Sequence, residues 1–289
     1  MKKIILIIQF SFIVLFSFAQ EKSVISTLST SSIDSLLTET AKKPITIKEK
    51  MNFFSEMFLN TDYDLECVGD GPYSQYEPWP LVNMEKTNCM SLCEHVLALS
   101  ISDSWDNFFN NLQKIRYNDG IIGIKSRNHY TMADWLPENN WLLKDVTKEV
   151  GKEYTANVTR NISHKKFFSK KGFLNLNYVK DDRELNIDYI KLEELHKVVD
   201  RLEVGDIAVL IYREKEDIFA AHMVMVMVKN GEKVIREATT SVMSTIDTEI
   251  SEWIRVKQEK SNKRYIGISV IRIKEEINSN KKIILPWEI

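Results

Sequence analysis

The chain has 289 residues, of which 44% are apolar and 28% charged, with only nine Gly and six Pro. This composition is typical of a globular protein of one full domain or two small ones, and it excludes fibrous and disordered chains. The 39 basic and 41 acidic side chains give a net charge of −2, so the chain lacks the excess of basic residues that is typical of a nucleic-acid-binding protein. Three Cys residues are too few for a disulfide scaffold.

The first 19 residues have the pattern of an export signal. Lys2 and Lys3 precede an almost continuously apolar run from Ile4 to Phe18, and Ala19 supplies a small residue for signal peptidase. This run of about 15 residues is shorter than the ~20 residues of a membrane-spanning helix. We therefore expect cleavage after Ala19, a periplasmic or secreted protein, and no stable membrane insertion of the mature chain. A retained N-terminal anchor is the alternative.

The mature chain begins with helices. Residues 20–45 are rich in Ser and Thr and predict a flexible leader with one short helix around 33–40, followed by a single catalytic domain over 46–289. Apolar spacing and caps predict helices at 45–60, from Cys89 onward, at 104–115, at 163–171 and at 191–201, with a loop region over 116–140.

The C-terminal third changes to β-rich runs at 206–212, 219–228, 233–239 and 265–273. Asn230-Gly231 is the strongest hairpin signal, because Asn and Gly accept positive φ at both central turn positions. Helices first and strands later indicate an α+β protein with helices packed on an antiparallel sheet.

Cys89 is the candidate nucleophile. Asn88 is a good N-cap, so Cys89 falls in the first turn of its helix, where the helix dipole lowers a thiol pKa below its usual ~8.5. Cys93 lies one turn further along and lacks this advantage. The alternative is that Cys89 is the first apolar residue of a buried helix face.

His222 is the candidate base, because it interrupts an apolar strand and a buried imidazole needs a hydrogen-bond partner. The two-residue turn at Asn230-Gly231 sets a register that places Glu237 diagonal to His222 on the same face, where it could orient the ring. A satisfied core histidine is the alternative. The other histidines are less suitable: His95 points away from Cys89 on its helix, and the charged surroundings of His164 and His196 predict solvated rings.

An ordered series of short motifs resembles a known family. The series is Gly71-Pro72-Tyr73, the run from Asn88 to Glu94, Arg127-Asn128-His129-Tyr130 with Asp134-Trp135, Gly205-Asp206, His222, the run from Glu237 to Thr240, and Gly267-Ile268. It is similar to the NlpC-type cell-wall cysteine peptidases, in particular their N-acetylmuramoyl-L-alanine amidase-like branch, over about residues 46 to 275. The resemblance implies a circularly permuted papain-like fold in which the Cys helix packs on the sheet that carries the His.

The resemblance also implies roles. Cys89 would be the nucleophile, His222 the base, Glu237 the third catalytic residue and Tyr73 a hydroxyl next to the thiol that helps to bind the oxyanion. The family's substrate-recognition loop would correspond to Arg127, Asn128, His129, Tyr130, Asp134 and Trp135; a loop held by its own hydrogen bonds is the alternative. The chain departs from the family at Asn88, where Asp is usual, and at Met90-Ser91, where a Thr is usual.

These observations predict an exported cysteine amidase that hydrolyses the bond between N-acetylmuramic acid and L-Ala in peptidoglycan fragments. One alternative is an endopeptidase of the same fold that cleaves between D-Glu and the diamino acid. Another is a non-catalytic peptidoglycan or glycan binder with Trp79, Trp135 and Trp141 as stacking surfaces. We expect no metal or other cofactor, because the sequence has no HExxH or CxxC spacing. A disulfide between Cys67 and Cys93 is compatible with an oxidising compartment.

Overall fold

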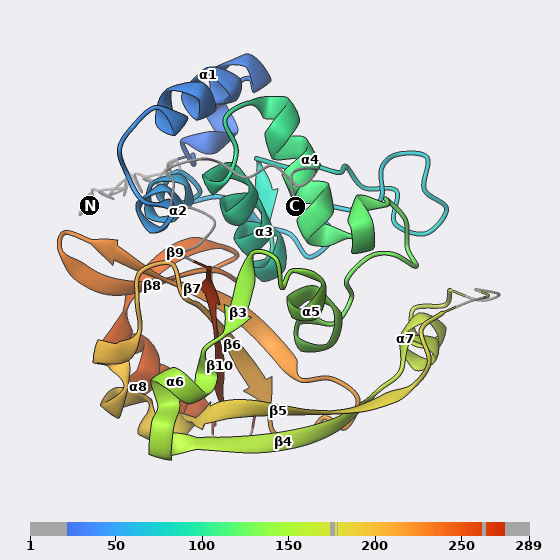
Figure 1. The fold of residues 1–289 in the computed structure, drawn as a ribbon, viewed down its shortest axis with the longest axis vertical. Helices are drawn as coiled ribbons and strands as arrows, with labels where there is room; N and C mark the ends of the chain where they lie inside the picture. The colour runs from blue at the N-terminus through green and yellow to red at the C-terminus, as the bar shows by residue number, and fades with distance from the viewer. Residues whose placement is uncertain (1–21, 174–176, 178, 262–263, 275–289) are drawn as a thin grey trace, which may run out of the picture.

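A computed structural model describes residues 22–173, 177, 179–261 and 264–274 of the chain. The predicted export signal lies outside these residues. Within them, ten strands form one mostly antiparallel sheet in the order β2-β1-β9-β8-β7-β6-β10-β5-β4, with β3 pairing with β10 (Figure 1). The strands are β1 (Asp62–Tyr63), β2 (Lys86–Thr87), β3 (Leu143–Asp145), β4 (Thr155–Ile162), β5 (Arg183–Lys191), β6 (Ile207–Tyr212), β7 (Ala220–Lys229), β8 (Glu232–Thr239), β9 (Ser244–Glu249) and β10 (Tyr265–Ile273).

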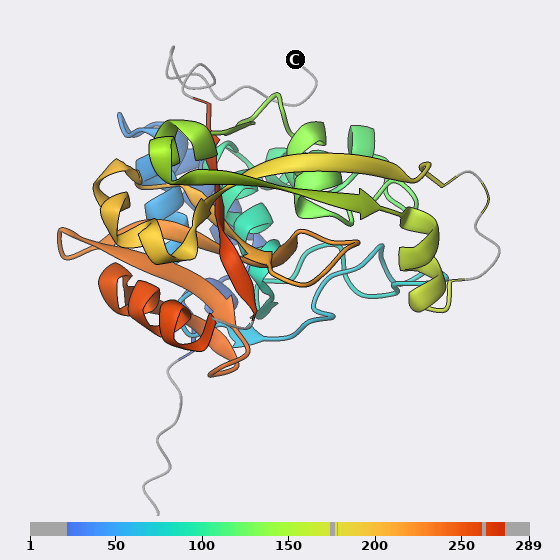
Figure 2. The ribbon, with the colours of Figure 1, turned by 90° about the horizontal axis from the view of Figure 1, so that it is seen from below.

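Helices cover both faces of the sheet, and the α+β prediction is confirmed. The α-helices are α1 (Thr30–Ala41), α2 (Ile47–Glu56), α3 (Cys89–Ser100), α4 (Trp105–Arg116), α5 (Leu136–Glu138), α6 (Thr147–Gly151), α7 (His164–Lys170) and α8 (Ile250–Ser261). Helices α1 to α4 gather on one side of the sheet (Figure 1), whereas α7 and α8 lie at opposite ends of the molecule (Figure 2). In the described part of the chain, no helix is both long and apolar enough to span a membrane.

Strand β7 separates two hydrophobic cores. Met223, Met225 and Met227 pack into the core shared with α1 to α4, whereas Val224 and Val226 pack into the core on the α8 side. Successive side chains of a strand point to opposite faces, so a continuously apolar strand stabilises both layers, at ~1.5–3 kcal/mol for each fully buried side chain. The predicted apolar strand at 219–228 is confirmed as β7.

The β7-β8 hairpin has the predicted register. Asn230 and Gly231 have φ of 53° and 85° in the turn, Lys229 pairs with Glu232, and Met225 pairs with Arg236. The β6-β7 pairing is irregular at the other end of β7, where the register shifts between the Leu210–His222 pair and the next one. Ala221 is thus an extra residue in β7, next to His222. Such a bulge changes the direction of the neighbouring side chains.

Two predictions of the organisation need correction. The leader is not loosely packed between residues 22 and 45: α1 spans Thr30–Ala41, and Ile25, Ile33 and Leu37 are fully buried in the main core. The Ser and Thr residues of this segment form local hydrogen bonds. Ser29 caps α1 by accepting from the Ser32 N–H, and Ser26 donates its hydroxyl to the Ser23 carbonyl. The region at 191–201 forms two short 3-10 helices, Leu192–Lys197 and Val199–Arg201.

Strands β4, β5 and β9 and helix α8 have no counterpart among the elements predicted from the sequence. Strands β4 and β5 lie at an edge of the sheet, and their charged, half-exposed sequences carry little of the apolar pattern that identifies a strand.

Candidate active site

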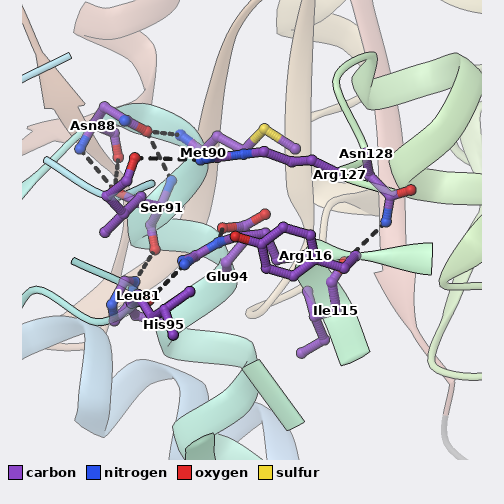
Figure 3. A network of polar contacts seen from close by, with 12 residues as sticks. Leu81, Asn88, Met90, Ser91, Glu94, His95, Ile115, Arg116, Arg127 and Asn128 are labelled. Atoms are coloured by element: carbon purple, nitrogen blue, oxygen red, sulfur yellow. Dashed lines mark hydrogen bonds and ion pairs between the residues drawn. The ribbon is translucent and has the colours of Figure 1, made fainter. Parts of the chain in front are cut away.

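The first turn of α3 presents Cys89. The Asn88 side chain accepts hydrogen bonds from the backbone N–H groups of Met90 (3.0 Å) and Ser91 (2.8 Å), and Ser91 Oγ accepts from the Asn88 N–H (2.9 Å). This reciprocal cap fixes the helix start, as predicted, and Figure 3 shows it in detail. Deeper in the helix, the buried Glu94 pairs with Arg116 of α4 at 2.8 Å, which braces α3 against its neighbour (Figure 3).

The fold brings Cys89 and His222 into contact. The His222 side chain lies close enough to the Cys89 thiol to lower its pKa, and the backbone N–H groups of Met223 and Met90 act on the sulfur in the same direction. Strand β7 packs directly against α3, so the first turn of the helix meets the start of the strand. Cys89 as a whole residue is only partly buried.

Glu237 holds the other side of the imidazole. Its Oε2 lies 2.6 Å from His222 Nε2, which leaves Nδ1 of the ring for the thiol. The indole N–H of Trp253 on α8 donates to Oε1 at 3.0 Å, and Lys257 Nζ lies 3.9 Å from Oε2. The carboxylate is 4% exposed and both of its oxygens have partners, so its orientation is fixed.

The electrostatics favour a charged pair. Burial alone would raise the pKa of Cys89, but the hydrogen bond and positive charge of His222 lower it below the ordinary value. Burial alone would lower the pKa of His222, but the hydrogen bonds and negative charges of Cys89 and Glu237 raise it to about 9. Near neutral pH the arrangement therefore stabilises a thiolate next to an imidazolium, which is the form in which a cysteine attacks a carbonyl carbon.

Tyr73 does not take the predicted place near the thiol. Its side chain is 100% exposed and packs against nothing. Tyr63 of β1 lies in that region instead, because β1 pairs with β2 immediately before Cys89, with Tyr63 opposite Thr87. Burial raises the pKa of Tyr63 to about 12, and the nearby Cys89 and Cys67 add to the shift, so its hydroxyl remains a proton donor. Sequence reasoning had no signal for Tyr63, since a two-residue strand has no periodicity.

The predicted recognition loop is part of the scaffold. Asn128, Tyr130, Asp134 and Trp135 are buried, so they offer no surface to a substrate. Asn128 donates to the Ile115 carbonyl at 3.3 Å (Figure 3), and Tyr130 donates its hydroxyl to the Ser163 carbonyl at 3.0 Å. These contacts fit the alternative of a loop held by its own hydrogen bonds, because the loop folds inward around a π-helical turn at Thr131–Trp135.

Arg127 and His129 are also engaged within the protein. Arg127 pairs with Glu77 at 2.6 Å. His129 Nε2 lies 2.6 Å from the Ile124 carbonyl, and its ring packs against those of Phe167 and Phe168.

Most of the remaining histidines and cysteines lie buried in the protein. His164 was expected to be solvated but is 2% exposed and bonds to Asp134 at 2.7 Å, whereas His196 is exposed as expected. Burial lowers the pKa of His95 to about 3, which keeps this ring neutral in the core. Cys67 and Cys93 are free thiols, so the disulfide considered from the sequence is not formed. Across the described ranges, no group of three or more His, Cys, Asp or Glu side chains is placed to hold a metal ion.

Comparison with known proteins identifies the family. Residues 53–261 match the model of the AmiA-like family, described as N-acetylmuramoyl-L-alanine amidase-like. The chain belongs to this family. The match covers all the residues of the Cys89, His222, Glu237 and Trp253 cluster.

Solved structures share the fold at low sequence identity. A protein from Legionella pneumophila has a TM-score of 0.73 and 19% identity, with 88% of this chain and 97% of that chain covered. An N-acetylmuramoyl-L-alanine amidase from Bacteroides uniformis has a TM-score of 0.63 and 24% identity, with 79% of this chain and 99% of that chain covered. A search of curated proteins gave no match.

Proposed function

We propose that the protein is an exported cysteine amidase that hydrolyses the amide bond between the lactyl group of N-acetylmuramic acid and L-Ala in peptidoglycan fragments. The observation that carries the proposal is the chain of contacts from Cys89 through His222 to Glu237 in a member of the AmiA-like family. The order of a helix-borne Cys followed by a strand-borne His also supports the NlpC-type assignment and a circularly permuted papain-like fold. The apolar N-terminal run supports export to the periplasm or secretion.

The mechanism follows from the charged pair. The Cys89 thiolate attacks the lactyl carbonyl carbon, and the negative charge moves to the carbonyl oxygen. The Tyr63 hydroxyl and the backbone N–H of Cys89 at the helix start are the donors that we assign to this oxyanion. His222 then gives its proton to the nitrogen of L-Ala, the C–N bond breaks, and the peptide leaves with a free amine.

The second half of the reaction releases the sugar. His222, now neutral, removes a proton from a water molecule, which attacks the thioester carbon and displaces the Cys89 thiolate. The muramic acid lactyl group leaves as a carboxylate, and His222 is again protonated. Glu237 stabilises the imidazolium in both halves because its carboxylate stays on Nε2.

Mass spectrometry of digested muropeptides tests the proposal. The wild-type enzyme should release sugar free of peptide, Cys89→Ser should abolish this release, and a chelator should leave it unchanged. Cleavage between D-Glu and the diamino acid would identify an endopeptidase instead. Iodoacetamide at about pH 6 should alkylate Cys89 faster than the buried Cys67 and Cys93, whose pKa values are raised by burial. An inert Cys89 together with retained muropeptide binding would favour a binding protein.

A further inference from the structure

Lys257 of α8 lies next to the Glu237 carboxylate. Its Nζ is 3.9 Å from Oε2, the same oxygen that lies 2.6 Å from His222 Nε2. The ammonium also lies over the ring of Trp253, one helical turn earlier on α8, at 5.2 Å from the ring centroid, where a cation is attracted to an aromatic face. Its side chain is 19% exposed. The carboxylate and the indole therefore hold the ammonium between them.

The charges of the site leave a place for one more cation. A thiolate at Cys89 on α3, an imidazolium at His222 on β7 and a carboxylate at Glu237 on β8 have one negative charge in excess. Glu237 is 4% exposed, and an uncompensated charge at such a buried position is costly. Lys257 supplies the missing positive charge, and within the described residues Glu237 is the only carboxylate at ion-pair distance from it.

The other ionisable groups nearby do not take this role. Three of them share a cavity wall with Glu237 and Lys257: Glu252, Arg264 and Tyr265. Glu252 pairs with Arg255 at 2.7 Å, and Arg264 lies 5.3 Å from the centroid of the Tyr265 ring. Burial raises the pKa of Tyr265, and burial also raises that of Tyr63 on the thiol side, so both hydroxyls stay neutral. In the part of the chain that the structure describes, only His222 and Lys257 bring a positive charge within ion-pair distance of Glu237.

The position of Lys257 bears on the proton that His222 transfers. In the proposed reaction His222 gives a proton to the L-Ala nitrogen and then takes one from water, and such a group works best when it neither holds nor loses its proton too readily. The negative charges of Cys89 and Glu237 both hold the proton on the ring. Lys257 shares Oε2 of Glu237 with His222, so its positive charge opposes this effect. We propose that Lys257 is a positioning residue that acts through Glu237 and limits how tightly His222 holds its proton; this rests on the proposed function.

The test measures the protonation of His222 directly. Cys89→Ser removes the thiolate and the turnover, and NMR of the His222 ring then gives its pKa. Adding Lys257→Met removes the ammonium and keeps an unbranched side chain that can still pack on Trp253. The pKa of His222 should rise by ~0.5–1 unit, because a positive charge has left its surroundings. With Cys89 intact, Lys257→Met should lower kcat for muropeptide cleavage ~3–10-fold with KM little changed.

Two controls separate charge from packing. Lys257→Arg keeps the positive charge and should leave the pKa of His222 near that of Cys89→Ser alone. Arg255→Met removes the same charge from the exposed face of the same helix, where Arg255 pairs with Glu252 and Glu259, and it should also leave this pKa unchanged. An unchanged or lower pKa of His222 in Lys257→Met, or an equal rise in either control, would overturn the role of Lys257. The NMR titration needs no turnover, so a rise confined to Lys257→Met would support this role even if the enzyme cleaved a bond other than the proposed amide.

Discussion

Replacing Glu237 with Gln removes the negative charge next to His222 while keeping the size of the side chain. The carboxylate accepts from His222 at 2.6 Å through one oxygen and from Trp253 at 3.0 Å through the other. The Gln amide has one acceptor oxygen and one donor nitrogen, so either the imidazole or the indole must lose its acceptor. The substitution therefore makes the protonated form of His222 less stable, even if the backbone does not move.

The size of the effect follows from the lost interaction. A hydrogen bond to a charged group contributes ~1.5–3 kcal/mol, which corresponds to a fall of ~1–2 units in the pKa of His222. The folded-state pKa of His222 is raised to about 9, so the imidazolium persists in the wild-type enzyme until the pH rises through that value. In Glu237→Gln the alkaline limb of kcat/KM should move from near 9 to ~7–8. At pH 8.5 this shift lowers the protonated fraction of His222, and with it kcat/KM, by ~3–25-fold, with a smaller loss near pH 6.

The assay is the pH profile of muropeptide cleavage, with thermal unfolding as a check on folding. Glu232→Gln is the control, because Glu232 lies at the exposed hairpin end of the same strand and gives the same change in net charge. Its profile should match the wild type. If the alkaline limb of Glu237→Gln coincided with that of the wild type, Glu237 would not set the protonation of His222 and the reasoning would be refuted.

Two further predictions concern Trp253 and Asp134. Trp253→Phe keeps the packing of a residue that is 3% exposed but removes the indole N–H from Glu237. The kcat should fall ~10-fold with KM little changed, and the alkaline limb of the pH profile should be displaced. Unchanged kinetics would assign Trp253 to packing alone. Burial would raise the pKa of Asp134, but His164, Lys180 and Arg183 lower it to about 2. Its pairing therefore stabilises the fold above the unfolded pKa of ~3.9, and about 2 kcal/mol should be lost as the pH falls toward 2. Urea unfolding from pH 6 to 2.5 should show this loss of unfolding free energy in the wild type. Asp134→Asn should be less stable at pH 6, and its unfolding free energy should depend less steeply on pH. Parallel pH dependences of the two proteins would contradict this role of Asp134.

The local sequence determined the parts of the site that lie within one element or one hairpin. Asn88 predicted the helix start that presents Cys89, because a cap depends only on the residues of the first turn. Asn230-Gly231 predicted the register that brings Glu237 to His222, because a two-residue turn fixes the pairing of its strands.

Tertiary packing decided which distant segments complete the cluster. Tyr63 and Trp253 come from β1 and α8, and nothing in their local sequences indicates that they lie near Cys89 and Glu237. Packing also turned the segment from Asn128 to Trp135 inward, where its polar groups bond to the protein instead of a substrate. Local propensity reflects the free energy of a few neighbouring residues, whereas burial depends on contacts between segments far apart in the chain.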